Sequence, residues 1–122
     1  MIAILSMRGG IDDALATDLI ARVEANIHFL PNRMRYSMNN ALIAMGGSMP
    51  AMRDRALAAA RTIGVVDVDH GETGCRTPDA VAMIGKMVAQ QAFKRTRVTR
   101  ARVQARPAGL RTRRAQRRSL AR

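Results

Sequence analysis

The sequence predicts an all-α fold, and three observations carry that prediction. Apolar residues make up 48% of the 122 residues, enough to build a modest core. That core must be rich in Ala and Met, because the chain contains nine Met but two Phe, one Tyr and no Trp. Such residues favour helices and fill irregular gaps between them, whereas sheets are enriched in aromatic and β-branched residues. Finally, apolar residues recur at helical spacing in segments that Gly and Pro separate.

The first expected helix follows Gly9-Gly10 and runs to about His28. Asp12 and Asp13 can cap its start, where acidic side chains also suit the helix dipole. Its apolar residues are expected to form a single stripe, made of Leu15, Leu19, Ile20, Val23 and Ile27.

A second helix is expected from about Arg33 to Met45, with Asn32 as its cap and Gly46-Gly47 as its end. Asparagine is mildly unfavourable inside a helix, so we expect Asn39-Asn40 to provide a hydrogen bond to the loop that follows the third helix. One face should be apolar and belong to the core: Met34, Met38, Ala41, Leu42 and Met45.

Two further helices complete the predicted fold. The third is expected to begin at Ser48, with Pro50 in its first turn, and to close at Gly64. The fourth is expected to begin at Thr77-Pro78-Asp79, which read as a cap, a proline at the first helical position and an acid behind it. Helical hairpins of this length are typical of stacked α-solenoid repeats, in which each unit buries a face against its neighbour.

The central loop, residues 64–79, reads GVVDVDHGETGCRTPD and gathers most of the chemically versatile side chains. Its first part alternates Val with Asp, which fits a short strand or extended coil; without a partner strand, we expect coil. Gly71 and Gly74 predict turns in which Asp and Thr side chains bond to nearby amides. The residues of candidate functional importance are Asp69, His70, Glu72, Cys75 and Arg76.

These loop residues include metal-ligand types, but they lack a paired spacing such as C-x-x-C or H-E-x-x-H. We therefore expect no metal and no other cofactor, and we interpret the loop first as structural. Contact with nucleic acid or substrate is the main alternative, and metal binding is a weaker one. Cys75 is the only cysteine, so it cannot form an internal disulfide, and we expect a buried, inert thiol in a reducing cytoplasm.

Charge is divided unevenly along the chain. Residues 1–85 carry eight Arg against all nine acids, a net charge of −1, whereas residues 86–122 carry two Lys and eleven Arg with no acid, a net charge of +13. A cationic segment of this kind repels itself, and we expect it to be disordered from about Lys94 until an anion binds. A solvated continuation of the fourth helix over residues 86–106 is the alternative.

Such a charge distribution favours nucleic acid as the partner. Arg33 and Arg35 lie about 200° apart on a helix, so one is expected to pair with an acid of the first helix while the other faces solvent or phosphate. The full set of candidate nucleic-acid-binding residues is Arg33, Arg35, Arg61, Lys94, Arg95, Arg97, Arg100 and Arg102.

Two blocks of sequence resemble a known family. LIARVEANIHFLPNRMRYSMNNALIAMG and ALAAARTIGVVDVDHGETGCRTPDAVAMIGK, matched best from Val23 to Lys86, are similar to the C-terminal part of the DNA alkylation repair enzyme family. That family resembles base-excision glycosylases built from HEAT-like repeats. The resemblance implies a concave basic surface that holds damaged DNA, and a carboxylate that promotes loss of an alkylated base. Family members are longer, and the Arg-rich end after Gln91 has no counterpart in them.

The sequence thus predicts HEAT/armadillo-like helical repeats over residues 1–91 and an Arg-rich tail over residues 92–122. We expect a C-terminal fragment of a DNA alkylation repair-like protein, with further repeats upstream of Met1, that binds double-stranded DNA, alkylated DNA included. No catalytic residue can be assigned, so enzymatic activity stays open, as does the oligomeric state. The start, Met1–Met7, lacks a basic region and is too short for a signal or membrane span, so it is expected to be the end of a packed helix in a soluble, cytoplasmic protein. The alternatives are a non-enzymatic α-solenoid module that docks a protein and a tail that binds nucleic acid without a repair role.

Overall fold

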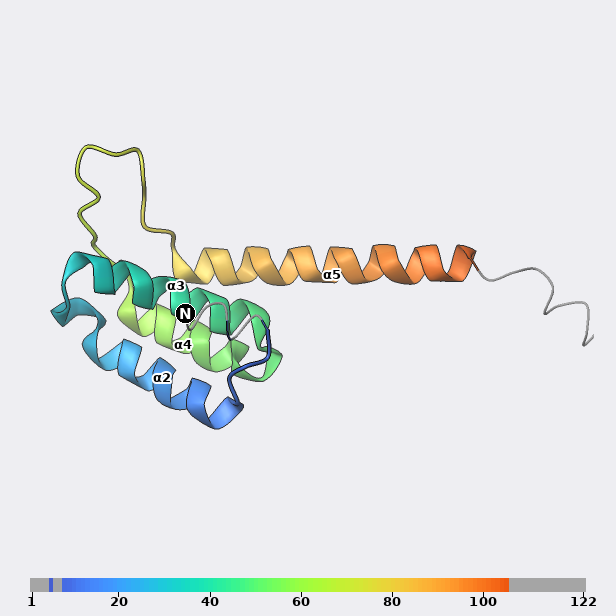
Figure 1. The fold of residues 1–122 in the computed structure, drawn as a ribbon, viewed down its shortest axis with the longest axis horizontal. Helices are drawn as coiled ribbons and strands as arrows, with labels where there is room; N and C mark the ends of the chain where they lie inside the picture. The colour runs from blue at the N-terminus through green and yellow to red at the C-terminus, as the bar shows by residue number, and fades with distance from the viewer. Residues whose placement is uncertain (1–4, 6–7, 106–122) are drawn as a thin grey trace, which may run out of the picture. The chain divides into compact units, whose positions relative to one another are not determined.

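A computed structural model describes Leu5 and residues 8–105 of the chain (Figure 1). Within these residues every regular element is a helix and there is no strand, which confirms the all-α prediction. The expectations for the apolar start and for residues 106–122 lie outside the described residues, apart from Leu5. The elements in chain order are α2 (Asp13–Asn26), the 3₁₀ turn η1 (Ile27–Phe29), α3 (Asn32–Ser48), the 3₁₀ turn η2 (Pro50–Met52), α4 (Arg53–Ile63) and α5 (Ala80–Gln104).

The chain divides into two units, Met1–Gln90 and Gln91–Arg122. We call the first unit the body; it contains α2 to α4, the central loop and the first eleven residues of α5. We call the described part of the second unit, residues 91–105, the cationic segment. In the described part of the chain, no helix is long and apolar enough to cross a membrane.

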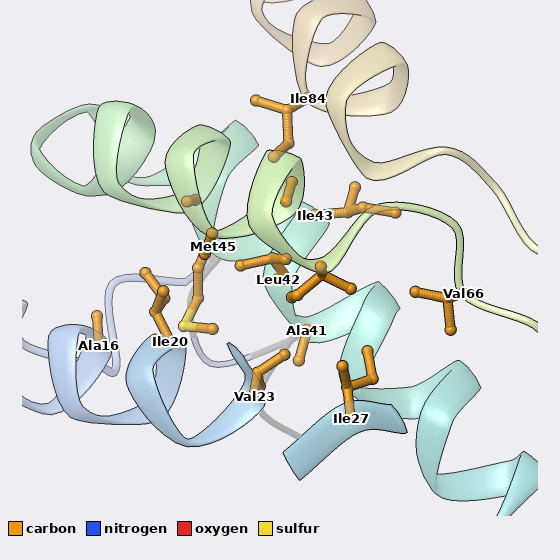
Figure 2. Packing of buried hydrophobic residues seen from close by; sticks show 14 of the residues in the cluster. Ala16, Ile20, Val23, Ile27, Ala41, Leu42, Ile43, Met45, Val66 and Ile84 are labelled. Carbon is orange, nitrogen blue, oxygen red and sulfur yellow. The ribbon is translucent and has the colours of Figure 1, made fainter. Parts of the chain in front are cut away.

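The core of the body lies where α2, α3 and α4 pack side by side (Figures 1 and 2). Met45 of α3 and Ile84 of α5 are fully buried in this core. From α2 and η1 the buried residues recur at helical spacing, as Ala16, Ile20, Val23 and Ile27. The predicted stripe was wrong at Leu15, which is 47% exposed, because Ala16, one position further round the helix, takes the buried place.

The sequence had suggested that Gly46-Gly47 ends the second helix, and this prediction was wrong. Instead, α3 continues to Ser48 and both glycines are buried. A Cβ atom on Gly46 would lie 2.6 Å from Cδ1 of Ile84 and 2.9 Å from Cβ of Ala56. These glycines therefore serve close packing against α4 and the start of α5, and they do not act as a stop signal.

The predicted caps are right at one helix start and displaced at the others. Asp12 caps α2, with its Oδ1 accepting a hydrogen bond from the amide of Leu15 at 2.7 Å. At α5 the cap is Asp79 and not Thr77, because Oδ1 of Asp79 accepts from the amides of Val81 and Ala82. Further corrections concern Asn32, which is the first residue of α3 and does not cap it, and Ser48, which ends α3.

Helix ends were predicted better where a glycine adopts a left-handed backbone. Gly64 closes α4 with φ of +69°, as expected. The fourth helix continues to Gln104, so the expectation of disorder from Lys94 was wrong over residues 94–104, and the alternative of a continued helix is confirmed there. The reason is local: the residues from Gln91 to Gln104 include no Gly or Pro and are dominated by good helix formers.

Candidate nucleic-acid interface

The central loop is held against the N-terminal half of α3 by two polar side chains one helical turn apart. Asn39, only 1% exposed, donates from Nδ2 to the carbonyl oxygen of Pro78 at 2.8 Å. This bond confirms that an asparagine within the helix binds the loop. Arg35 donates from Nε to the carbonyl oxygen of Leu30 at 2.6 Å and from one terminal nitrogen to that of Asp67 at 3.1 Å. Both ends of the loop are therefore anchored to α3.

Within the loop, short-range hydrogen bonds define two turns. Oδ1 of Asp69 accepts from the amide of Gly71 at 2.8 Å, and Gly71 has φ of +64°. The hydroxyl of Thr73 donates to the carbonyl oxygen of His70 at 2.8 Å and accepts from the amide of Cys75 at 3.4 Å. These bonds confirm the predicted turns, in which Asp and Thr side chains satisfy nearby amides.

His70 connects two parts of the loop and also contacts α3. Its Nε2 shares a hydrogen bond with Oγ1 of Thr77 at 2.9 Å, across the base of the loop. The imidazole ring also meets the ring of Tyr36 edge to face, with centroids 5.4 Å apart and planes at 88°. Tyr36 was not among the predicted site residues, although its spacing from Asn32 and Arg33 places it on the same helix start.

The remaining loop candidates are exposed. Glu72, Cys75 and Arg76 all lie at the surface, so the expectation of a buried thiol at Cys75 was wrong. Cys75 lies in a stretch after the turn at Gly71 in which every residue through Arg76 is exposed. Among the described residues, no group of three or more His, Cys, Asp or Glu side chains is placed to hold a metal ion. Asp69 and His70 thus shape the loop, and the other three candidates offer free side chains.

The predicted pairing of one arginine with an acid of the first helix was wrong for both Arg33 and Arg35. Arg35 is engaged with carbonyl oxygens of the loop, and Arg33 is exposed. The ion pairs of the described residues are Arg22–Asp18 at 3.0 Å, within α2, and Arg55–Glu24 at 2.8 Å, between α4 and α2. Glu24, a half-buried acid of α2, therefore takes its partner from α4, which sequence reasoning did not foresee.

Two shallow hollows flank the central loop on the body. One, of about 320 Å³, is lined by Arg33 and Tyr36 of α3 together with Val68, Asp69 and His70 of the loop, and by Asn32 and Ser37. The other, of about 270 Å³, is lined by Arg61 at the end of α4, by Asn39 and by both ends of the loop. The two exposed body arginines among the predicted contacts, Arg33 and Arg61, thus lie at different hollows.

The cationic segment contains the remaining residues that were predicted to bind nucleic acid. Each of its residues is exposed, and five of them are the cations Lys94, Arg95, Arg97, Arg100 and Arg102. No acid occurs after Asp79, and within the described residues none of these cations forms an ion pair. The guanidinium carbon of Arg97 lies 6.0 Å from the centroid of the Phe93 ring, which leaves its N–H groups free to donate to an anion. These five cations, within nine residues of one helix, are the densest group of cations without an ion-pair partner in the described part of the chain.

Comparison with known proteins gives relatives without an assigned activity. The chain is similar to an uncharacterized protein of Listeria monocytogenes and to another of Listeria innocua, each 37% identical over 71 residues. That match covers 58% of this chain and 32% of each relative, so the chain spans about a third of the length of the curated relatives it matches. No protein-family model matches the chain, and no solved structure matches it.

Proposed function

We propose that this chain is the C-terminal portion of a DNA alkylation repair-like protein built from HEAT-like helical repeats, and that it binds double-stranded DNA through its basic residues. The observation that carries DNA binding is the division of charge between residues 1–85, of net charge −1, and the acid-free residues 86–122, of net charge +13. Cations that are exposed and unpaired can exchange their counterions for phosphates. The packing of α2, α3 and α4 side by side supports a repeat architecture.

The location of the bound phosphates follows from how each arginine is already used. In the body, Arg22, Arg35 and Arg55 are engaged by acids or carbonyl oxygens, and the other cations are spread along a stretch that also holds all nine acids of the chain. In the cationic segment no such partner exists among the described residues. We therefore place most of the DNA affinity in the Lys- and Arg-rich end of the chain, with Arg33 and Arg61 as secondary contacts.

A charge-matched pair of variants of the full chain tests this proposal. The first changes the five cations of the cationic segment to Gln: Lys94, Arg95, Arg97, Arg100 and Arg102. The second removes the same charge from exposed positions of the body, by changing Arg8, Arg22, Arg33, Arg61 and Arg76 to Gln.

Affinity for a duplex is measured by fluorescence anisotropy over a series of salt concentrations. Each lost phosphate contact should reduce the slope of log K against log salt by about 0.9, so the first variant should lose up to about 4.5 from its slope. The body variant should lose clearly less. If the body variant loses more, the DNA surface lies on the helices of the body and the proposal is wrong; if the native chain shows no salt-dependent binding, DNA is not the partner.

A second candidate, a non-enzymatic α-solenoid module that docks a protein, is favoured by a different observation. Phe29 and Val65 are 85% and 89% exposed, well above the other exposed large apolar side chains described in the body, of which Leu15 and Met34 reach 47%. A protein partner that binds the chain equally well at low and high salt, through these two residues, would favour this candidate.

A further inference from the structure

We propose that the cationic segment of α5 binds DNA by lying in the major groove of the duplex, with phosphates of both strands at its two sides. This inference rests on the proposed function, that the chain binds double-stranded DNA, and adds the groove and the binding geometry. It follows from how the cations are arranged around the helix.

The five cations spread over an arc of about 220° of the helix circumference, and the remaining arc of about 140° carries no charge. Consecutive residues of an α-helix are about 100° apart, so Lys94, Arg97 and Arg100, at intervals of three, fall within an arc of about 120°. We call these three the first side. Arg95 and Arg102 are seven positions apart and lie within about 20° of each other, roughly 150° from Arg97 and about 80–100° from Lys94. We call this pair the second side.

An uncharged edge separates the two sides on the part of the helix opposite Lys94. Ala92, Thr96 and Val103 lie within an arc of about 40° there, and none of them carries a charge. The hydroxyl of Thr96 donates to the carbonyl oxygen of Ala92 at 3.0 Å, so it is satisfied within the helix. What this edge offers to a ligand is methyl groups, which suit the floor of a groove where thymine methyls are exposed.

The distribution of cations on both sides of the helix favours binding in a groove of the duplex over binding along the outside of one strand. A helix lying along one strand from the outside meets phosphates on one side, and the cations of its other side stay unneutralised in water. In a groove, the phosphates of the two strands form two walls, so both sides are neutralised at once. The segment contains no acid that could neutralise these cations. Like charges about one turn apart repel each other and destabilise the free helix. Phosphates on both walls of a groove would therefore also relieve the repulsion between these cations.

The diameter of the helix, compared with the widths of the grooves, indicates which groove and which nucleic acid it fits. An α-helix with side chains is about 10–12 Å across, and the major groove of B-DNA is about 12 Å wide. The minor groove, about 6 Å wide, is too narrow, and the major groove of an RNA duplex is deep and closed to side chains. Double-stranded DNA is therefore the duplex that this helix fits.

Two charge-matched double variants of the full chain test the two-sided geometry. Arg97→Gln with Arg100→Gln removes the two first-side cations nearest to the uncharged edge, and Arg95→Gln with Arg102→Gln removes the two of the second side. In anisotropy titrations with a DNA duplex, each variant should lower the slope of log K against log salt by about 1.8, two contacts at about 0.9 each. If one variant lowers the slope and the other leaves it unchanged, the helix uses one face and the inference is wrong.

A flexible polycation would also use all its charges, so a second measurement tests the helix itself. Thr99→Pro keeps every charge but breaks the helix in the middle of the segment, and Thr99→Ala is its control. We expect the proline variant to bind duplex DNA at least about tenfold more weakly than the alanine variant, a difference of 1.4 kcal/mol. Equal affinity of the two variants would overturn the inference, even where DNA binding itself persists.

A third measurement tests the groove. The native chain is titrated with one duplex in ordinary form and in a form whose pyrimidines carry bulky C5 substituents that fill the major groove, and with an RNA duplex of equal length. We expect at least about tenfold weaker binding to both alternatives. If all three duplexes bind with equal affinity, the chain contacts phosphates only and the proposed major-groove geometry is wrong. If the native chain binds no duplex DNA at all, the proposed function has failed as well.

Discussion

Replacing Gly46 by Ala adds one methyl group where α3 packs against Ala56 of α4 and Ile84 of α5. The new Cβ would lie 2.6 Å from Cδ1 of Ile84 and 2.9 Å from Cβ of Ala56. The terminal methyl of Ile84 can move only within a core in which its side chain is fully buried, and the Cβ of Ala56 moves only with its helix. The substitution therefore forces α3 and α4 apart.

The magnitude follows from two opposing effects. Overpacking a well-filled core typically costs about 1–3 kcal/mol, whereas exchanging a helical Gly for Ala gains up to about 1 kcal/mol. We expect Gly46→Ala to lower the free energy of unfolding by about 1–2 kcal/mol. For a domain of this size that corresponds to a fall in Tm of roughly 4–8 °C per kcal/mol.

The chain provides matched controls for the same chemical change. Gly85 also lies in a helix, but a Cβ built there would meet no atom within 4 Å, so Gly85→Ala should raise stability by about 0.5–1 kcal/mol. Gly47→Ala should fall between the two, because its Cβ would meet the flexible end of Met87, with Sδ at 2.6 Å. The expected order of stability is Gly85→Ala, then Gly47→Ala, then Gly46→Ala.

Urea unfolding followed by far-UV circular dichroism measures all three variants against the native chain. An unchanged m value shows that the midpoint shift reports stability and not a change in the denatured state. If Gly46→Ala stabilises the chain as much as Gly85→Ala does, the helices are not in the close contact described and the reasoning is refuted.

Three other outcomes are expected. Asn39→Ala should cost about 1–3 kcal/mol, because it leaves the carbonyl of Pro78 without its donor, while Asn40→Ala, as a control in the same unfolding assay, should cost clearly less. Truncation after Gln91 should remove most of the affinity for duplex DNA and flatten its salt dependence; a truncated chain that keeps both would place the DNA surface on the body. The chain alone should release no alkylated base from methylated DNA above background, and release that depends on one Asp or Glu would contradict this.

Local signals in the sequence predicted the local features of the fold. Asp12 directly before an apolar-periodic segment predicted the cap of α2, and Gly64 predicted the end of α4, because each depends on backbone conformation within one turn. The hydrogen bond from Asn39 to the loop was also predictable, since an asparagine inside a helix needs a partner for its amide.

Features that depend on distant residues were beyond sequence reasoning. A pair of glycines after an apolar stretch is a common helix end, and only the positions of Ile84 and Ala56 show why Gly46 stays inside α3. Likewise, nothing local indicates that Arg35 reaches the carbonyl of Asp67, 32 positions further along the chain. The exposure of Cys75 follows from the course of the loop, which the residue types alone did not specify.

The two parts of the chain use the same side chain for opposite purposes. In the body, an arginine such as Arg35 donates at short range to carbonyl oxygens, and Arg55 donates to a half-buried carboxylate, so these guanidinium groups hold the loop and α4 in place. In the cationic segment, the described arginines contact no acceptor of the chain and raise the free energy of the isolated helix by repulsion. An anion is the group that lowers that energy. Because Arg35 holds the loop in place, its mutation should be interpreted first as a change in loop anchoring, whereas mutations in the cationic segment should be interpreted first as changes in binding.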